Sequence, residues 1–243
     1  MLKLVICDWN RTLFEDKYEE IFFRGLSRHV LLQAVKKFNI PKVYILWRIK
    51  NKCNNLLLQV NNGDKYIKDI INILNENIIR DLPLGFLNEY TKKYAKNAVK
   101  RLDKRILEPL KRLRLSKGIK LGIISSGYIS GIEQTLKNAG YIFDFIKAND
   151  FEINGDTLIR FKLDVFNNKK EILKKVLTDY SMNSKETIYI GDDWQDEECF
   201  EEVGYPVVSF LAEEKYKKSF SGKFSAFVPE DEDTFREYLL KNL

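Results

Sequence analysis

Short apolar runs rich in β-forming residues, each ending at polar residues, recur along the chain. The first run, from Leu2 to Cys7, is followed at once by Asp8. A short continuous apolar run is typical of a strand that is buried on both faces of a parallel sheet. Similar runs occur at 119–124, 143–147, 187–190 and 206–210. The chain is therefore constrained to a sheet that other elements cover on both sides.

Helical patterns alternate with these runs, at residues 129–138, 169–179 and 196–203. This alternation predicts an α/β fold, namely a doubly wound, mainly parallel sheet with helices on both faces. Residues Phe151–Phe161 depart from it and resemble a β-hairpin, in which Asn154-Gly155 would supply the left-handed residues of a tight turn.

Residues 17–105 contain no comparable series of strands. Apolar residues there recur at spacings of three and four, as in Ile67, Ile70, Ile71 and Leu74, which is the period of a helix. Internal turns are expected at Asn61–Asp64 and at Asp81–Pro83. We therefore expect an α/β core domain formed by 1–16 and 106–243, and a helical domain inserted at 17–105.

Charge is divided unevenly along the chain. Residues 17–118 carry 23 Lys/Arg against 9 Asp/Glu, whereas the remainder carries 18 against 26. A basic segment beside an acidic one favours an anion-attracting surface next to a carboxylate cluster that binds a metal. The competing interpretation is a solvated, lysine-rich surface.

The sequence also predicts where the protein works. No apolar run approaches the roughly 20 residues needed to cross a bilayer, and the start lacks a signal-peptide pattern. Cys7, Cys53 and Cys199 are odd in number and scattered, so we expect reduced thiols. These features predict a cytoplasmic protein without a membrane partner, and its oligomeric state stays open.

Four polar segments follow predicted strands or open helices. They are Asp8–Leu13, Ser125–Tyr128, Lys169-Lys170 and Gly191–Asp196. In a doubly wound sheet, ligands bind at the carboxyl edge of the strands. Phosphoryl transfer needs an in-line nucleophile, a divalent cation and donors around the phosphoryl oxygens. Carboxylates, a serine hydroxyl and a lysine ammonium at one edge could supply all of these.

These segments resemble, in order and spacing, the four motifs of the haloacid dehalogenase (HAD) superfamily. Asp8 to Thr12 corresponds to Asp-x-Asp-x-Thr with one change, and Gly191 to Asp196 corresponds to Gly-Asp-x-x-x-Asp. Ser125 and Lys169 stand for the second and third motifs. The insert between the first two motifs resembles a C1-type helical cap on a Rossmann-like core, as in the phosphoserine phosphatase branch.

The resemblance implies a role for each motif residue. Asp8 would be the nucleophile and a Mg²⁺ ligand, with Asp192 as a second ligand and the Asn10 backbone carbonyl as another. Asp193 or Asp196 would complete the carboxylate shell. Ser125 and Lys169 would hold the phosphate, with Ser126 and Lys170 as neighbouring alternatives. Other residues expected in the phosphate site are Arg11, Thr12, Ser126 and Gly127.

Asn10 is the departure that affects function. Hydrolases of this superfamily carry a second Asp there, which protonates the leaving oxygen and later activates water. An amide cannot exchange that proton at neutral pH. Arg11 is a second departure, since the family usually has Gly there.

Three hypotheses follow. The first is a Mg²⁺-dependent phosphomonoester hydrolase that acts on a small phosphorylated metabolite through an aspartyl phosphate. The second, favoured by Asn10, is a catalytically weak phosphate- or nucleotide-binding protein. The third is a nucleic-acid phosphatase or binder, favoured by the basic insert with its aromatic residues Tyr44, Trp47, Tyr66, Tyr90 and Tyr94. Their spacing also fits a helical core.

Overall fold

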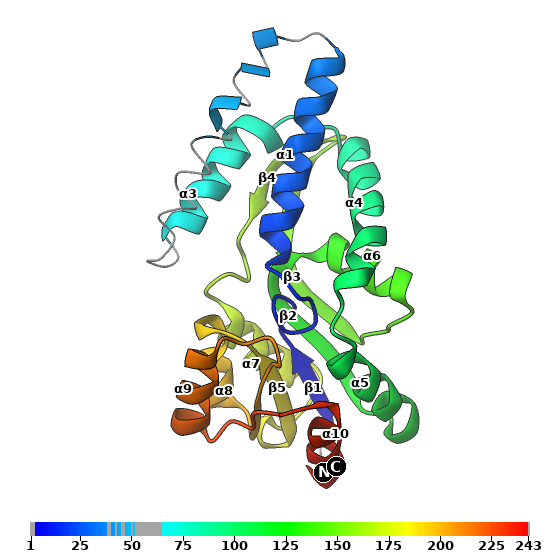
Figure 1. Ribbon diagram of the computed structural model, residues 1–243, viewed down its shortest axis with the longest axis vertical. Helices are drawn as coiled ribbons and strands as arrows, with labels where there is room; N and C mark the ends of the chain where they lie inside the picture. The colour runs from blue at the N-terminus through cyan, green and yellow to red at the C-terminus, as the bar shows by residue number, and fades with distance from the viewer. Residues whose placement is uncertain are drawn as a thin grey trace. The chain divides into compact units, whose positions relative to one another are not determined.

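The computed structural model describes residues 3–37, 40, 41, 43, 44, 47–49, 51 and 65–242. The expected turn at Asn61–Asp64, Cys53 and the side chain of Tyr66 lie outside the described residues. The α/β class is confirmed, because the described chain forms a six-stranded, mostly parallel sheet with helices. Figure 1 shows the order of these elements along the chain.

The strand order in the sheet is β4-β3-β2-β1-β5-β6. Strands β1, β2, β3, β5 and β6 pair in parallel, and β4 pairs with β3 in antiparallel fashion. The chain leaves the central strand β1 toward β2 and β3, and later returns to the opposite side at β5 and β6. The strands are β1 (Leu4–Cys7), β2 (Lys120–Tyr128), β3 (Phe145–Asn154), β4 (Thr157–Lys162), β5 (Thr187–Gly191) and β6 (Tyr205–Val208).

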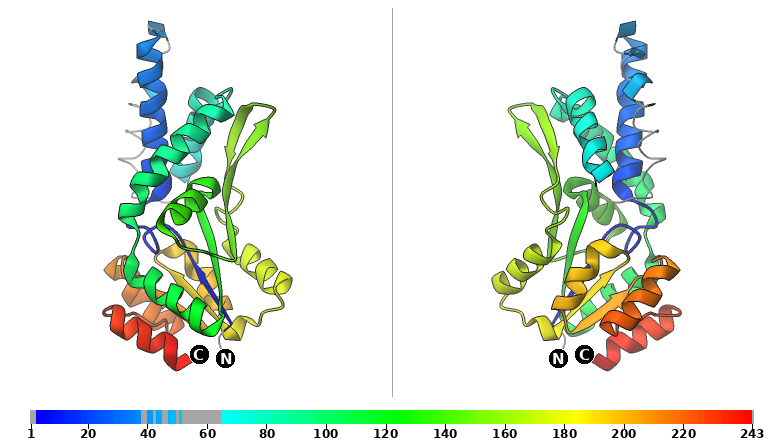
Figure 2. Two further views of the ribbon diagram at one scale, coloured as in Figure 1. Left: turned by 90° about the vertical axis from the view of Figure 1, so that its right-hand side faces the viewer. Right: turned by 90° about the vertical axis from the view of Figure 1, so that its left-hand side faces the viewer.

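Helices cover both faces of this sheet. On one face α7, α8 and α9 pack over alternate side chains of the strands, among them Leu4 and Ile6 of β1 and Tyr189 of β5. On the other face lie α5, which contacts β2, and α10, which contacts α5. Figure 2 shows α5 and α10 on one side of the sheet and α7 on the other. The helices are α5 (Lys104–Lys117), α6 (Ile129–Ala139), α7 (Lys169–Asp179), α8 (Glu197–Glu202), α9 (Glu214–Phe224) and α10 (Glu232–Asn242).

The described chain divides into two compact units. Unit 1 comprises Met1–Glu19, Tyr94–Asn149 and Leu163–Leu243, and unit 2 comprises Glu20–Lys93 and Asp150–Lys162. The expected boundaries lay at 16/17 and 105/106. Two aromatic contacts account for part of the difference, because Tyr18 packs edge-on against both Trp9 and Tyr94 and so ties the start of one helix and the end of another to unit 1.

Unit 2 is mostly helical and also contains the hairpin of β3 and β4. Its helices include most of α1 (Tyr18–Lys36), α3 (Lys65–Leu74) with a π-helical turn at Asn75–Ile79, and most of α4 (Leu84–Ala98). The hairpin belongs here because Phe161 packs edge-on against Phe23 at a centroid distance of 4.8 Å. Asn75 also bonds both backbone groups of Phe161, donating to the carbonyl at 3.2 Å and accepting from the amide at 2.7 Å. None of the described helices is long and apolar enough to cross a membrane.

Two local expectations need correction. Gly155 has φ +56°, but Asn154 stays in β3 and pairs with Thr157, so the hairpin turn needs only one left-handed residue. The expectation that the aromatic residues of the insert pack in a core holds for Tyr90, which is buried. It fails for Tyr44 and Trp47, which stack on each other but are 59% and 56% exposed.

Close packing at Gly131 of α6 gives a test of the fold. A Cβ at this position would fall on the hydroxyl of the fully buried Tyr18. Gly→Ala inside a helix normally stabilises by about 0.5–1 kcal/mol. Here we expect Gly131→Ala to lower the free energy of unfolding by about 1–3 kcal/mol, because overpacking outweighs the gain in helix propensity.

The matched control is Gly222→Ala in α9, where a Cβ would meet nothing within 4 Å. This variant should be neutral or more stable. Chemical denaturation of both variants measures the difference, and equal shifts would show that Tyr18 does not constrain Gly131.

Candidate active site

The motif residues gather at the carboxyl ends of neighbouring strands of unit 1. Asp8 follows β1, Asp192 follows β5, and Ser125 lies in the second half of β2. Strand β1 pairs with both β2 and β5, so these three strands are neighbours. The backbone amide of Asp8 donates to the carbonyl of Ile190 at 2.8 Å, which fixes the first motif beside the fourth. The site therefore lies where the strand order reverses direction, the position at which open α/β sheets bind ligands.

Three carboxylates form a buried cluster. Asp8, Asp192 and Asp196 each offer an oxygen, and these oxygens all lie within 4.8 Å of one another. Asp196 is oriented by three donors: its Oδ1 accepts from Lys169 Nζ and from the Tyr189 hydroxyl, and its Oδ2 accepts from the Asp192 amide at 3.0 Å. Because both oxygens of Asp196 are engaged, Asp8 and Asp192 are the carboxylates better placed to hold a cation.

Lys169 is the counter-charge within this cluster. Its ammonium lies 2.7 Å from Asp196 Oδ1 and 3.1 Å from Asp8 Oδ1, and its side chain is almost completely buried. Asp8 Oδ1 accepts no hydrogen bond from the described residues, so its contact with Lys169 is ionic. Lys170, the alternative, points elsewhere and lies 3.6 Å from Glu201. The geometry thus brings Lys169, not Lys170, to the first motif.

The cluster has more negative charge than one lysine can balance, and the pKa values reflect this. Burial raises the pKa of Asp8 to about 8, although Lys169 acts in the opposite direction. Burial and the neighbouring Asp193 raise the pKa of Asp192 well above its usual value. Burial alone would lower the pKa of Lys169, but Asp196 and Asp8 outweigh it and hold that pKa well above normal. A divalent cation would relieve this imbalance.

Asn10 uses its side-chain amide to hold the loop after β1. Its Oδ1 accepts from the backbone amide of Tyr18, at the start of α1, at 2.9 Å. Its Nδ2 donates to Ser126 Oγ at a longer 3.4 Å. The side chain therefore links the first motif to the second, a role that its place in the motif did not predict.

The second motif offers a buried hydroxyl beside a turn of backbone. Ser125 Oγ is fully buried and accepts from the Gly127 amide at 3.1 Å. The strand pairing of β2 with β3 shifts register between Ser125 and Tyr128, so the backbone is irregular at this point. Such irregularities often re-aim side chains near active sites. Ser126 is occupied differently, since its hydroxyl faces Asn10.

Arg11 adopts a left-handed conformation, with φ +49°. This region suits glycine and costs other residues free energy, which gives a physical reason for Gly at this position in related motifs. Here side-chain contacts compensate. The guanidinium donates to Glu213 at 2.8 Å and to the Leu211 carbonyl at 3.2 Å, and Ser209 Oγ donates to the Arg11 carbonyl at 2.7 Å. Arg11 therefore fastens the loop to the segment after β6.

Two other predicted residues lie at the edge of the carboxylate cluster. The Thr12 hydroxyl is buried and lies 3.5 Å from Asp192 Oδ1, so it faces the proposed metal ligand. Asp193 is only half-buried, and its Oδ1 accepts from the Gln195 amide at 2.9 Å, which caps the following helical turn. Burial and Asp196 raise the pKa of Asp193 as well.

Sequence reasoning missed three residues that support the site. Asn149 is fully buried, donates to the Ser126 carbonyl at 2.6 Å and accepts from the Val165 amide at 2.8 Å. Tyr189 orients Asp196, and Ser209 holds Arg11. Their only sequence signal is their position in or next to the strands of the sheet, which does not show that they contact the motifs.

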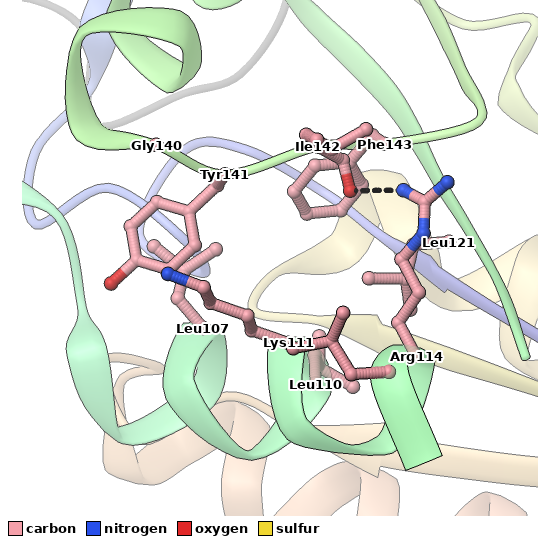
Figure 3. A pocket seen from close by; sticks show the side chains of 10 residues that line it. Leu107, Leu110, Lys111, Arg114, Leu121, Gly140, Tyr141, Ile142 and Phe143 are labelled. Atoms are coloured by element: carbon pink, nitrogen blue, oxygen red, sulfur yellow. Dashed lines mark hydrogen bonds between the residues drawn. The ribbon is translucent and has the colours of Figure 1, made fainter. Parts of the chain in front are cut away.

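An apolar cavity of about 90 Å³ lies elsewhere in unit 1. Figure 3 shows it between α5 and the segment before β3, with Leu107, Leu110 and Tyr141 in its walls. Leu121, near the start of β2, also lines it, so the cavity lies toward the amino ends of the strands. It is therefore separate from the motif residues at the carboxyl ends.

Comparison with solved structures agrees with this architecture. A phosphoserine phosphatase in its apo form has a TM-score of 0.60 at 20% identity, covering 99% of this chain and 98% of that one. A phospho-aspartyl intermediate analogue of phosphoserine phosphatase gives 0.55 at 18%, covering 93% and 92%. A protein with unknown function from Bordetella pertussis Tohama I gives 0.68 at 10%, covering 95% and 99%. At these identities the similarity shows the fold alone.

Comparison with curated protein sequences finds no match. The family model of haloacid dehalogenase-like hydrolases matches residues 45–210, which is more than half of the chain. This match confirms the expected superfamily, and with it the expectation of a hydrolase. The chain belongs to the haloacid dehalogenase-like hydrolase family.

Proposed function

We propose that this protein is a Mg²⁺-dependent phosphomonoesterase that works through a phosphorylated Asp8. The observation that carries the proposal is the buried arrangement of Asp8, Asp192 and Lys169 at the carboxyl edge of the sheet in a chain of this hydrolase family. The substrate class is a small phosphorylated metabolite. The solved structures of similar fold support this class, since they include a substrate-bound phosphoserine phosphatase complex and a phospho-aspartyl intermediate analogue of phosphoserine phosphatase.

The residues present fit a magnesium ion. Mg²⁺ prefers oxygen ligands and usually takes one or two protein carboxylates while keeping some of its water. Asp8 and Asp192 would hold it, with the Asn10 backbone carbonyl as the further ligand that the motif implies. When bound, the cation would neutralise charge on the phosphoryl oxygens and favour the ionised form of Asp8. The raised pKa of Asp8 without metal supports this requirement.

The chain's own residues divide the chemistry between them. An ionised Asp8 oxygen attacks phosphorus, the bond from phosphorus to the substrate oxygen breaks, and that oxygen must gain a proton. Water then attacks the aspartyl phosphate, which frees Asp8 and inorganic phosphate. Lys169, fixed by Asp196, and the Ser125 hydroxyl would bind the phosphoryl oxygens throughout. Thr12, Ser126, Gly127 and Arg11 would support the phosphate site.

We further propose that the helical residues of unit 2 act as the cap of this enzyme, and that the chain functions as a core of 1–16 and 106–243 with an insert at 17–105. The positive charge of the insert supports attraction of an anionic substrate. The buried free thiols of Cys7 and Cys199 support a reducing, cytoplasmic environment.

The second candidate is a catalytically weak phosphate- or nucleotide-binding protein, and the geometry of Asn10 favours it. The Asn10 amide is engaged with Tyr18 and Ser126, and it has no proton to exchange at neutral pH. On this reading the metal and phosphate sites still bind their ligands, while turnover falls by an amount on the order of 10² to 10⁴.

A panel of phosphorylated compounds, assayed with and without Mg²⁺, tests the proposed function directly. We expect Mg²⁺-dependent release of phosphate, and we expect Asp8→Asn to abolish it because the nucleophile is lost. The matched control is Asp179→Asn, the same chemical change at an exposed position of α7, which should leave the rate unchanged. Phosphate release that survives Asp8→Asn would exclude the aspartyl-phosphate route.

Replacing Asn10 by Asp separates the two candidates. Asp has nearly the same size, keeps the acceptor for the Tyr18 amide, and lets Ser126 donate instead of accept. We expect turnover of an aryl phosphate to rise by roughly tenfold or more, since general acid–base catalysis contributes on the order of 10² to 10⁴. Phosphorylated Asp8 should accumulate in the unmodified protein, and mass spectrometry of protein quenched during turnover can detect it.

Asn10→Ala is the control for this substitution, because it removes the side-chain amide of Asn10 without adding a carboxylate, and it should gain no activity. An unchanged rate in Asn10→Asp, together with brisk turnover and no phosphoenzyme in the unmodified protein, would mean that another group transfers the proton.

The pKa of Asp8 predicts how Mg²⁺ stabilisation depends on pH. Between the usual value near 4 and about 8, the folded metal-free protein holds a proton that the unfolded chain releases, so its stability falls as pH rises. Mg²⁺ competes with that proton. The rise in Tm on adding a fixed, subsaturating Mg²⁺ concentration should therefore be larger at pH 8.5 than at pH 6.5.

Thermal denaturation at the two pH values measures this difference. Asp192→Asn, which removes a proposed ligand, should suppress the Mg²⁺ effect at both. A Mg²⁺-induced shift in Tm of equal size at both pH values would show that Mg²⁺ binding does not displace a proton from Asp8.

A further inference from the structure

Unit 2 has five large apolar side chains that are exposed and lie outside its core. The large side chains of Leu32, Val35, Ile40, Tyr44 and Trp47 are between 49% and 75% exposed. We call these five residues the apolar patch. The face of α1 opposite Leu32 and Val35 packs into the core, since Phe22, Leu26, Val30 and Ala34 are buried at spacings of four residues. The apolar patch is therefore an addition to the packing face of α1, and not part of it.

The charged side chains in the sequence around the apolar patch are all Lys or Arg. Between Glu20 and Asp64 the chain has eight Lys/Arg and no Asp/Glu. On α1, Arg24, Arg28 and Lys36 are exposed at the same four-residue spacing as Leu32. Arg24 pairs with Glu20, but Arg28, Lys36 and Arg48 form no ion pair with any described residue. The face thus combines exposed apolar groups with unneutralised positive charge.

This combination of apolar and basic side chains limits the class of binding partner that fits the surface. A second copy of the chain would meet the same positive surface, since an isologous interface apposes identical patches. Single-stranded nucleic acid would use the cations and the stacked Tyr44 and Trp47, but it gives the aliphatic Leu32, Val35 and Ile40 no role. An anionic lipid surface suits both parts, because cations meet the headgroups while aliphatic side chains and Trp or Tyr enter the boundary with the acyl chains.

We propose that the apolar patch and its basic neighbours dock this protein onto the surface of anionic lipid bilayers. Leu32, Val35 and Trp47 would insert at the headgroup level, with Arg28 and Arg48 near the lipid phosphates. This revises the expectation of no membrane partner, which rested on the lack of a spanning segment. Interfacial binding depends on an amphipathic face and not on spanning length.

Sedimentation of the full chain with phospholipid vesicles tests the proposal. We expect binding to phosphatidylglycerol-containing vesicles, little binding to pure phosphatidylcholine, and weakening as salt rises because exposed charges are screened. Leu32→Ser/Val35→Ser should lower the partition coefficient by about tenfold, since it removes inserted apolar surface. Arg28→Glu/Arg48→Glu should weaken binding selectively to the anionic vesicles.

The matched control is Leu115→Ser/Leu240→Ser, which makes the same kind of change at exposed helical positions of unit 1. Its binding should stay within about twofold of the unmodified protein, and thermal midpoints should confirm that all variants remain folded. No binding to anionic vesicles, or equal effects of the two serine pairs, would overturn the proposal. Binding to single-stranded RNA in place of vesicles would also overturn it and assign the surface to nucleic acid.

Discussion

Lys169 lies between Asp8 and Asp196, with its ammonium 3.1 Å and 2.7 Å from their carboxylate oxygens, and all three side chains are buried. Buried charges are costly unless they are paired and hydrogen-bonded. A single lysine cannot balance Asp8, Asp192 and Asp196 together. Burial is the main cause of the raised pKa values of Asp8 and Asp192, and the neighbouring carboxylates raise them further. Under the proposed function, a divalent cation would supply the positive charge that this cluster lacks.

Backbone geometry makes such a cluster possible. Because β1 is flanked by β2 and β5, residues that follow different strands are held side by side by the sheet's own hydrogen bonds. The three carboxylates are then not equivalent. Asp196 gives both oxygens to Lys169, Tyr189 and the Asp192 amide, so it orients the lysine and the turn, and it leaves Asp8 and Asp192 for ligands. The three aspartates therefore differ in role because the carboxylate of Asp196 is already engaged in hydrogen bonds.

The parts of the structure that follow from local patterns were predictable from sequence. Helix α7 occupies Lys169–Asp179 as expected, and β1 and β5 lie within about two residues of their apolar runs. The motif segments meet because parallel strands place their carboxyl ends together. The supporting contacts were not predictable, because Asn149 and Ser209 reach the motifs across distances of 23 and 198 residues in sequence.

The hairpin shows a different limit of sequence reasoning. Strand β3 leaves the core sheet and continues into unit 2 without a break, so no composition change marks the transition. What assigns the hairpin to unit 2 is the packing of Phe161 on Phe23 and its pairing with Asn75. Periodicity likewise placed Tyr44 and Trp47 in a helical core, although both are exposed, because spacing identifies a helix face without saying what covers it.

The two departures from the family motif lie next to each other and act on the same loop. Arg11 carries the left-handed backbone that glycine adopts without cost, and its contacts with Glu213, Leu211 and Ser209 offset that cost. Asn10 fixes the other side of the loop to the start of α1 and to Ser126. A carboxylate at position 10 must be free to exchange protons with substrate and water, whereas an amide can serve as a fixed strut. In this chain the side chains of Asn10 and Arg11 hold the loop in its shape, and under the proposed function an amide at position 10 would slow proton transfer.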